Sequence, residues 1–145
     1  SPLTDDKFNF LTFYEVPYND FNYLSVVQSF YIYSGGAHGN TTYNTLTYNT
    51  ETGMDVGFKD LFKEGTDYKA LLTTLVKEEL AARGEKATGF TFQQVDDTTQ
   101  FYLTPSGLVL LFPHYKIAPY SAGEIRVHIP WWKLYEQVNP ALPVH

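Results

Sequence analysis

The residues of this chain whose types and spacing could do chemistry begin with a glycine-rich segment, Gly-Gly-Ala-His-Gly at positions 35–39. Three glycines in five positions favour backbone angles that other residues avoid, or a close approach by a neighbouring strand. Histidine titrates between pH 5 and 8, so His38 could act as a base, but the sequence places no nucleophile beside it. The segment is therefore either a structural connection between strands or a surface that contacts a partner. As a contact surface it would use Gly35, Gly36, His38 and Gly39.

A loop at positions 113–123 is the second candidate contact surface. Its two prolines lower the entropy lost when a loop is held against a partner, and its two tyrosines offer a large contact area for few rotatable bonds. The alternative is that its own apolar side chains pin the loop to the core. The residues that we expect to contact a partner are Tyr115, Lys116, Pro119 and Tyr120.

The other reactive side chains do not form a catalytic or metal-binding motif. The chain has no cysteine, and its four histidines show none of the close spacings of zinc ligands. The adjacent carboxylates Asp96 and Asp97 would point to opposite faces of a strand and precede a polar turn. Ser34 and Ser106 lack the Gly-x-Ser-x-Gly setting of an activated serine. We therefore expect no catalytic residue, no metal and no other cofactor.

The charge of the chain restricts its partners. The formal net charge is -6 with a sequence pI near 5.0, and lysine and arginine form no cluster. Nucleic acids and anionic membranes are bound mainly through clustered basic residues, so neither is an expected partner. A basic protein is the better electrostatic match. No apolar run is long enough to cross a membrane.

The spacing of apolar residues predicts an α+β fold, in which a mostly antiparallel sheet packs against one main helix. A stripe of apolar residues every three to four positions places that helix at about residues 67–83. A continuous apolar run at 108–112 indicates a strand buried on both faces. We expect a single domain over residues 1–145. The strand patterns occupy positions 8–16, 22–33, 41–50, 90–94, 100–104, 108–112 and 125–129.

The strand expected at 22–33 alternates between an apolar face and a face rich in tyrosine. The apolar face carries Leu24, Val26 and Phe30, and we expect the tyrosine face to be the wet one. A turn is expected at 17–20, before this strand. Near the other end of the chain, the paired tryptophans at 131–132 are expected to fill the core.

An ordered set of short motifs extends over positions 23–134. They include Tyr-Ile-Tyr-Ser-Gly-Gly-Ala-His-Gly at 31–39, Lys-Asp-Leu-Phe at 59–62 and Ile-Ala-Pro-Tyr-Ser-Ala-Gly at 117–123. The set resembles a bacterial domain of unknown function. That domain forms the extracytoplasmic part of RsiV, the lysozyme-sensing anti-sigma factor, and a similar one accompanies the catalytic domain of the peptidoglycan deacetylase PdaC.

The resemblance implies an extracytoplasmic domain of the cell envelope, in the periplasm or at the cell surface, that does no catalysis itself. It also implies a protein partner, since the domain of RsiV binds lysozyme: a basic protein such as a lysozyme-like muramidase. Peptidoglycan fragments are the alternative ligand, and an uncharacterised hydrolase is a third reading. Family members carry a further N-terminal region. The resemblance therefore implies that this chain lacks part of that region and that a longer precursor could bear a lipid anchor.

Overall fold

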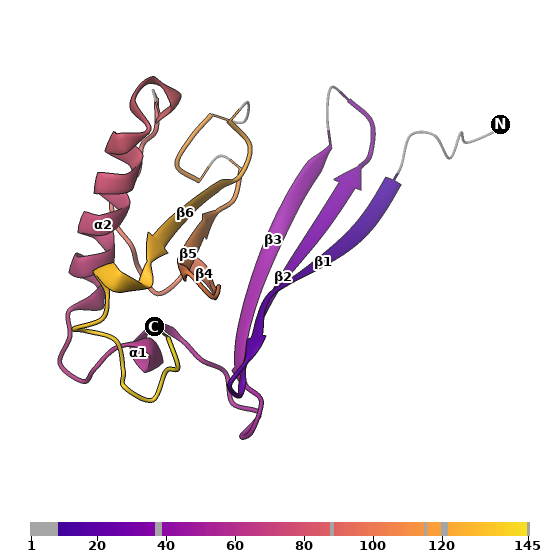
Figure 1. Cartoon of the computed structure of the whole chain (residues 1–145). Helices are drawn as coiled ribbons and strands as arrows, with labels where there is room; N and C mark the ends of the chain where they lie inside the picture. Colours follow the sequence, from indigo (N-terminus) through magenta and orange to yellow (C-terminus); the bar gives the residue numbers. More distant parts are fainter. Residues whose placement is uncertain (1–8, 37–38, 88, 115, 120–121, 145) are drawn as a thin grey trace.

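Two three-stranded antiparallel sheets and one main helix make up the fold in the computed structural model (Figure 1). The structure describes residues 9–36, 39–87, 89–114, 116–119 and 122–144. The predicted α+β class is confirmed, with the strands divided between two sheets. In chain order the elements are β1 (Asn9–Asp20), β2 (Tyr23–Tyr33), β3 (Asn40–Asn49), α1 (Phe58–Leu61), α2 (Tyr68–Ala82), η2 (Gly84–Ala87), β4 (Gln100–Leu103), β5 (Gly107–Phe112), β6 (Ile125–Pro130) and η4 (Trp131–Lys133).

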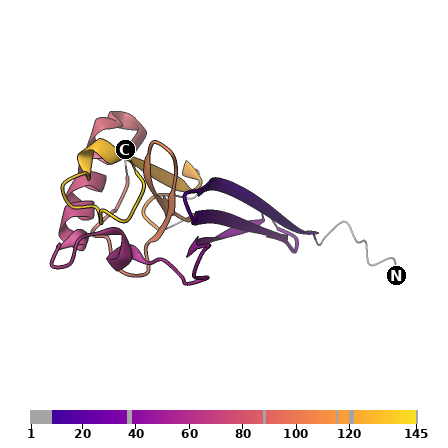
Figure 2. The ribbon, with the colours of Figure 1, turned by 60° about the horizontal axis from the view of Figure 1, so that its bottom comes forward.

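The elements are arranged in three layers: α2, then the C-terminal sheet β4–β5–β6, then the N-terminal sheet β1–β2–β3 (Figure 1 and Figure 2). Asp67 caps the N-terminus of α2, where its carboxylate accepts a hydrogen bond from the Ala70 N–H (3.1 Å). The helix buries an apolar stripe against the C-terminal sheet. Strand β5 lies in the middle layer and is buried along its whole length, as predicted from its apolar run.

The core has two parts, one on each side of β5. On the α2 side, Leu108 and Leu110 of β5 join the helix in the larger hydrophobic cluster. On the other side, Val109 and Leu111 pack with Val27 of β2 in a smaller cluster. Alternate residues of one strand thus hold both neighbouring layers, as the period-2 geometry of a strand requires.

The N-terminal sheet differs from expectation at its first turn. Strand β1 continues through positions 17–20 instead of turning there, and a register shift between Glu15 and Tyr18 accommodates Pro17. Proline has no N–H to donate to a neighbouring strand, so within sheets it occurs at edge strands and bulges, and Pro17 lies at both. The chain turns instead at Phe21 and Asn22, whose φ angles are positive (48° and 69°).

Two further expectations are wrong. Positions 90–94 form no strand; Thr91 donates its N–H to the Ile117 carbonyl (2.7 Å) without entering a ladder. Of the two tryptophans, Trp131 is 2% exposed but Trp132 is 66% exposed, because consecutive residues of the short η4 helix point in different directions. No helix in the described part of the chain is long and apolar enough to cross a membrane.

Candidate functional site

The glycine-rich segment is the connection between β2 and β3. Gly35 and Gly36 have φ angles of +100° and +104°, which side chains other than glycine's rarely adopt, and the Tyr33 hydroxyl donates to the Gly36 carbonyl (3.0 Å). A side chain at Gly39 would overlap the Tyr31 ring. His38 lies outside the described residues. Backbone conformation thus explains glycine at positions 35 and 36, and close packing explains it at position 39. The contact of this segment with a partner stays a prediction.

The loop that follows β5 is pinned to the core by Ile117 and Ala118, both buried. Lys116 and Pro119 are exposed, whereas Tyr115 and Tyr120 lie outside the described residues. In the view of Figure 1, this loop and the β2–β3 connection lie toward the same end of the molecule. The packing alternative thus holds for part of the loop, and its exposed residues stay candidates for partner contact.

An ion pair joins the two sheets across their interface. Both Arg126 guanidinium Nη atoms, on β6, donate to the Glu15 carboxylate on β1, at 2.9 Å each, and Arg126 Nη1 also donates to the Tyr102 hydroxyl (3.2 Å). These hydrogen bonds hold the pKa of Glu15 below its ordinary 4.5 and raise the pKa of Arg126. Nearby, burial and the Glu124 carboxylate raise the pKa of Tyr43 to about 12. This cluster clamps the sheets together.

We expect Glu15→Gln to lower the free energy of unfolding by about 0.5–1 kcal/mol at neutral pH, a small value because half of the Glu15 side chain is exposed. The pKa of Glu15 is lower in the folded chain, so its stabilisation is full above about pH 4.5 and is lost as the pH falls through the folded pKa. Urea unfolding at several pH values should show the difference from wild type disappearing in acid. The control, Glu78→Gln, alters an exposed helical carboxylate; an equal loss there would contradict the clamp.

A serine and a histidine that are distant in sequence meet at the turn before β5. Ser106 Oγ and His128 Nε2 lie 3.0 Å apart. A catalytic pair also needs a group that orients the other ring nitrogen, and no carboxylate in the described part of the chain contacts His128. The Gly107 N–H, a potential oxyanion donor, is already bonded to Thr104 Oγ1 (2.9 Å). The contact links the turn before β5 to β6. The two residues lie 22 positions apart, so no spacing motif in the sequence indicated it.

The two faces of the N-terminal sheet are the reverse of what the sequence indicated. The inner face, toward the C-terminal sheet, buries Ser25 and Val27 (both 0% exposed), and Ser25 Oγ shares a hydrogen bond with Thr47 Oγ1 (2.8 Å). The outer face is the apolar one, and none of its residues belongs to either hydrophobic cluster of the described residues. Its members on β1, β2 and β3 are Phe10, Tyr14, Leu24, Val26, Phe30, Ile32 and Leu46.

Strand β1 adds to this apolar surface. It pairs with β2 along one edge, and no described strand pairs with its other edge. Phe10 is 56% exposed, Tyr14 63% and Ile32, opposite Phe10 on β2, 41%. A long, apolar edge strand is a ready-made site for association with another chain.

The charged residues of the N-terminal sheet and its adjoining turns are all aspartate or glutamate. No lysine or arginine occurs anywhere in residues 8–58. The stretch carries only carboxylates: Glu15, Asp20, Glu51 and Asp55. The basic residues of the fold thus lie outside this sheet, and one of them, Arg126 of β6, is paired with Glu15 on the inner face.

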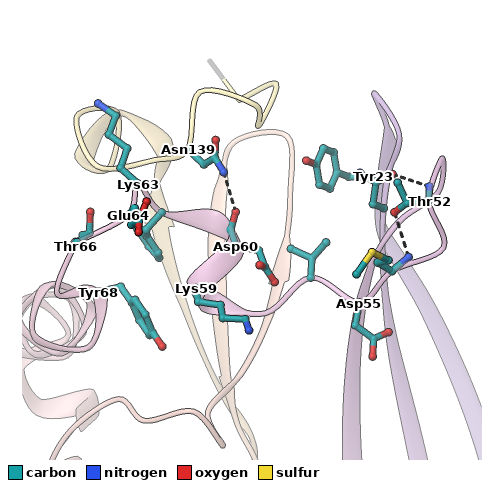
Figure 3. A pocket seen from close by; sticks show the side chains of 15 residues that line it. Tyr23, Thr52, Asp55, Lys59, Asp60, Lys63, Glu64, Thr66, Tyr68 and Asn139 are labelled. Atoms are coloured by element: carbon teal, nitrogen blue, oxygen red, sulfur yellow. Dashed lines mark hydrogen bonds between the residues drawn. The ribbon is translucent and has the colours of Figure 1, made fainter.

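An open cleft of about 780 Å³ lies at the other end of the N-terminal sheet, between its β2–β3 base and α1. Figure 3 shows Tyr23 and Asp55 on one side and Lys59, Asp60 and Tyr68 on the other. Sequence reasoning missed this cleft because its walls come from distant segments. No group of three or more metal-ligating side chains occurs in the described part of the chain, the cleft included.

Fold and surface together define a small α+β domain whose apolar outer face and polar cleft are both open to solvent. Residues 59–132 match the family described as "Protein of unknown function (DUF3298)", and residues 1–41 match the one described as "Deacetylase PdaC". The chain belongs to the DUF3298 family. The predicted relationship to the peptidoglycan deacetylase is thereby supported, and the resemblance to RsiV stays a prediction.

Two curated relatives match about three quarters of the chain. Esterase Rv3036c of Mycobacterium tuberculosis is 29% identical over 113 residues, which are 73% of this chain and 48% of the esterase. The peptidoglycan-N-acetylmuramic acid deacetylase PdaC of Bacillus subtilis is 27% identical over 112 residues, 73% of this chain and 24% of the deacetylase. The chain thus spans less than half the length of either relative.

Solved structures of DUF3298 proteins share the fold. A protein from Pseudomonas aeruginosa PAO1 aligns with a TM-score of 0.74 and 22% identity over 92% of this chain and 63% of its own. A protein from Bacteroides fragilis aligns with a TM-score of 0.76 and 23% identity over 90% of this chain and 54% of its own. At this level of identity the likeness concerns the fold.

Proposed function

We propose that this chain is a non-catalytic recognition domain of the bacterial cell envelope, in the periplasm or at the cell surface, and that it binds a basic protein through the outer face of its N-terminal sheet. A lysozyme-like muramidase is the candidate partner. The relationship to a peptidoglycan deacetylase supports a setting at the cell wall.

The single observation that carries this proposal is the uncovered apolar outer face. Leu24, Val26 and Phe30 alternate along β2 in the manner of a buried strand face, yet they lie outside both hydrophobic clusters of the described residues. Burying apolar side chains is favourable by roughly 25 cal/mol per Å². A sheet face of this kind gains that free energy when a second surface covers it.

The charge of the N-terminal sheet indicates which kind of protein would bind to its outer face. Glu15 is paired with Arg126, but the other three carboxylates of residues 8–58, with no lysine or arginine among those residues, give the N-terminal sheet a net negative charge. That charge speeds the approach of a positively charged partner. Lysozymes of the animal type are basic. We expect the association to weaken as salt rises, because salt screens exposed charges beyond about 8–10 Å.

Two phenylalanines of β1 provide a matched test. Phe10 and Phe13 are equally exposed (56%), but Phe10 lies on the outer face and Phe13 on the inner one. In calorimetric titrations with hen egg-white lysozyme, we expect Phe10→Ser to weaken binding by at least about tenfold, because aromatic side chains that a partner buries carry much of the binding free energy. Phe13→Ser should leave the affinity unchanged. Equal losses in both variants, or no heat with the wild-type chain, would overturn the proposal.

The non-catalytic part of the proposal has its own test. The esterase relative makes ester hydrolysis the reaction to examine, with p-nitrophenyl acetate as the probe. Because the Ser106–His128 contact lacks an orienting carboxylate in the described residues, we expect no turnover above that of Ser106→Ala. Hydrolysis by the wild-type chain that disappears in this variant would show that the domain is an enzyme.

A further inference from the structure

We infer that the cleft between α1 and the base of the N-terminal sheet binds a short, uncharged oligosaccharide whose sugars carry acetamido groups. The cleft volume, about 780 Å³, lies within the range of small-ligand sites. The residues that carry the argument are Tyr23, Met54, Asp55, Lys59, Asp60 and Tyr68 (Figure 3).

Two tyrosine rings stand on opposite walls of the cleft, and one of them is fixed before any ligand arrives. The Tyr68 ring stacks on Phe62 with centroids 5.8 Å apart and planes inclined by 9°, and its hydroxyl donates to Asp97 Oδ1 (2.9 Å). Tyr23, from β2, is half-buried on the other wall. Tyrosine offers an apolar ring with a polar tip, a combination that suits the C–H faces and hydroxyls of sugars.

The polar groups of the cleft are also held in place. Asp60 Oδ2 accepts the Gly57 N–H (2.9 Å), and the Asp60 carbonyl accepts from Asn139 Nδ2 (3.4 Å). Asp60 Oδ1 has no hydrogen-bond partner among the described residues. Lys59 and Asp55 are exposed and have no hydrogen-bond or ion-pair partner in the described part of the chain. Because Asp60 is already held in place, less entropy is lost when a ligand binds to it. The side chains of Lys59 and Asp55 remain available to form hydrogen bonds with the ligand.

The lining of the cleft carries charges of both signs, which suits a ligand whose groups both donate and accept hydrogen bonds. The lining carries the carboxylates of Asp55, Asp60 and Glu64 together with the ammonium groups of Lys59 and Lys63. An anion would meet three carboxylates, a cation would meet two ammonium groups, and an apolar molecule would remove all five from water at a cost. Hydroxyl groups both donate and accept, so a saccharide satisfies either sign at each position.

One wall of the cleft places apolar side chains next to a carboxylate, a combination that suits an acetamido group. Met54, 69% exposed, and Val56 offer apolar surface beside the Asp55 carboxylate. An acetamido methyl group would cover that surface while its N–H donates to a carboxylate. A sugar that bears a hydroxyl in place of the acetamido group forgoes the apolar contact. A sugar that bears a free amine also lacks the acetamido methyl group and forgoes the same contact.

Titration of the whole 145-residue chain with three trisaccharides, followed by NMR chemical-shift changes, tests this inference. We expect N,N′,N″-triacetylchitotriose to bind saturably with a Kd in the millimolar range and to shift the amides of residues 54–60. Cellotriose, which lacks acetamido groups, should bind several-fold more weakly, as should the glucosamine trimer. Equal binding of all three sugars, preference for the glucosamine trimer, or no shifts at this cleft would overturn the inference.

A pair of lysine variants isolates the cleft. Lys59→Ala should weaken triacetylchitotriose binding by about tenfold, the typical loss of a hydrogen bond to a charged group. Lys77→Ala, on the exposed side of α2 and outside this cleft, should leave the affinity unchanged. Equal affinities of the two variants would contradict the inference. Because no lysozyme is present and Phe10→Ser should retain sugar binding, failure here is distinguishable from failure of the protein-binding proposal.

Discussion

Replacing Trp131 with alanine is expected to lower the free energy of unfolding by about 3–5 kcal/mol, whereas Trp132→Ala should change it by less than about 0.5 kcal/mol. Trp131 is 2% exposed within the larger hydrophobic cluster, and its indole N–H donates to the Thr104 carbonyl (2.9 Å). Its removal leaves a cavity and an unpaired carbonyl at the end of β4. Trp132 is 66% exposed, and its ring lies near the Lys133 ammonium (5.5 Å).

Urea unfolding followed by circular dichroism measures both variants under identical conditions. The comparison is sharp because the two positions are adjacent and carry the same side chain, so only their surroundings differ. Similar losses for the two variants would mean that the C-terminal layer is not packed as described. The midpoint should shift without a change in slope if the variants affect stability alone.

Gly107→Ala is expected to destabilise the chain by about 3 kcal/mol, because an added methyl group would overpack a buried strand. Gly107 opens β5, and a Cβ atom there would collide with the Ile129 backbone carbonyl and lie 2.7 Å from His128 Nε2. The backbone carbonyl belongs to the paired strand β6 and cannot rotate away. Relief would require β5 and β6 to separate.

The matched control is Gly57→Ala. Gly57 has a φ of -99°, which any residue adopts, and a Cβ there would meet only Asp60 Oδ2, at 3.8 Å. We expect Gly57→Ala to alter the free energy of unfolding by less than about 0.5 kcal/mol. Thermal unfolding of both variants checks the contrast, and a Gly107→Ala variant as stable as wild type would show that the β5–β6 pair has room that the structure lacks.

The elements that local pattern determines were predictable. Helix α2 follows from a stripe every three to four residues with a capping Asp67, and both signals are short in sequence. Strand β5 follows from an unbroken apolar run. The segment at 90–94 was wrongly predicted as a strand because Phe90 and Phe92 alternate with polar residues, yet they pack against the core from a loop.

The outer face of the N-terminal sheet was not predictable from the alternation of residue types along β2. The alternation of residue types indicates that β2 has two different faces, but it does not indicate which face another layer covers. That depends on the C-terminal sheet, whose Leu103 is 78 positions from Ser25 in the sequence. Small inner residues such as Ser25 permit the close approach; its hydroxyl even accepts the Leu103 N–H (3.0 Å). Contacts between residues far apart in the sequence therefore determine which face of β2 is buried, and the local sequence pattern does not contain them.

The candidate sites were predictable only where their residues are consecutive. The glycine segment and the loop at 113–123 could be found as motifs, and both are connections at the surface. The cleft joins Tyr23, residues 49–68 and Asn139, which only the fold brings together. The ion pair of Glu15 with Arg126 spans 111 positions. Such sites leave no spacing signal in a single sequence.

The stretch without lysine or arginine determines how the outer face can be probed. Trypsin cleaves after these two residues, so the whole N-terminal sheet should appear in mass spectra as one peptide from Phe8 to Lys59. Amine-reactive cross-linkers have no target in that peptide before its last residue. Amine-reactive reagents would therefore miss a partner bound there, whereas carbodiimide coupling to the exposed Asp20, Glu51 or Asp55 would capture it, with the partner supplying the amine.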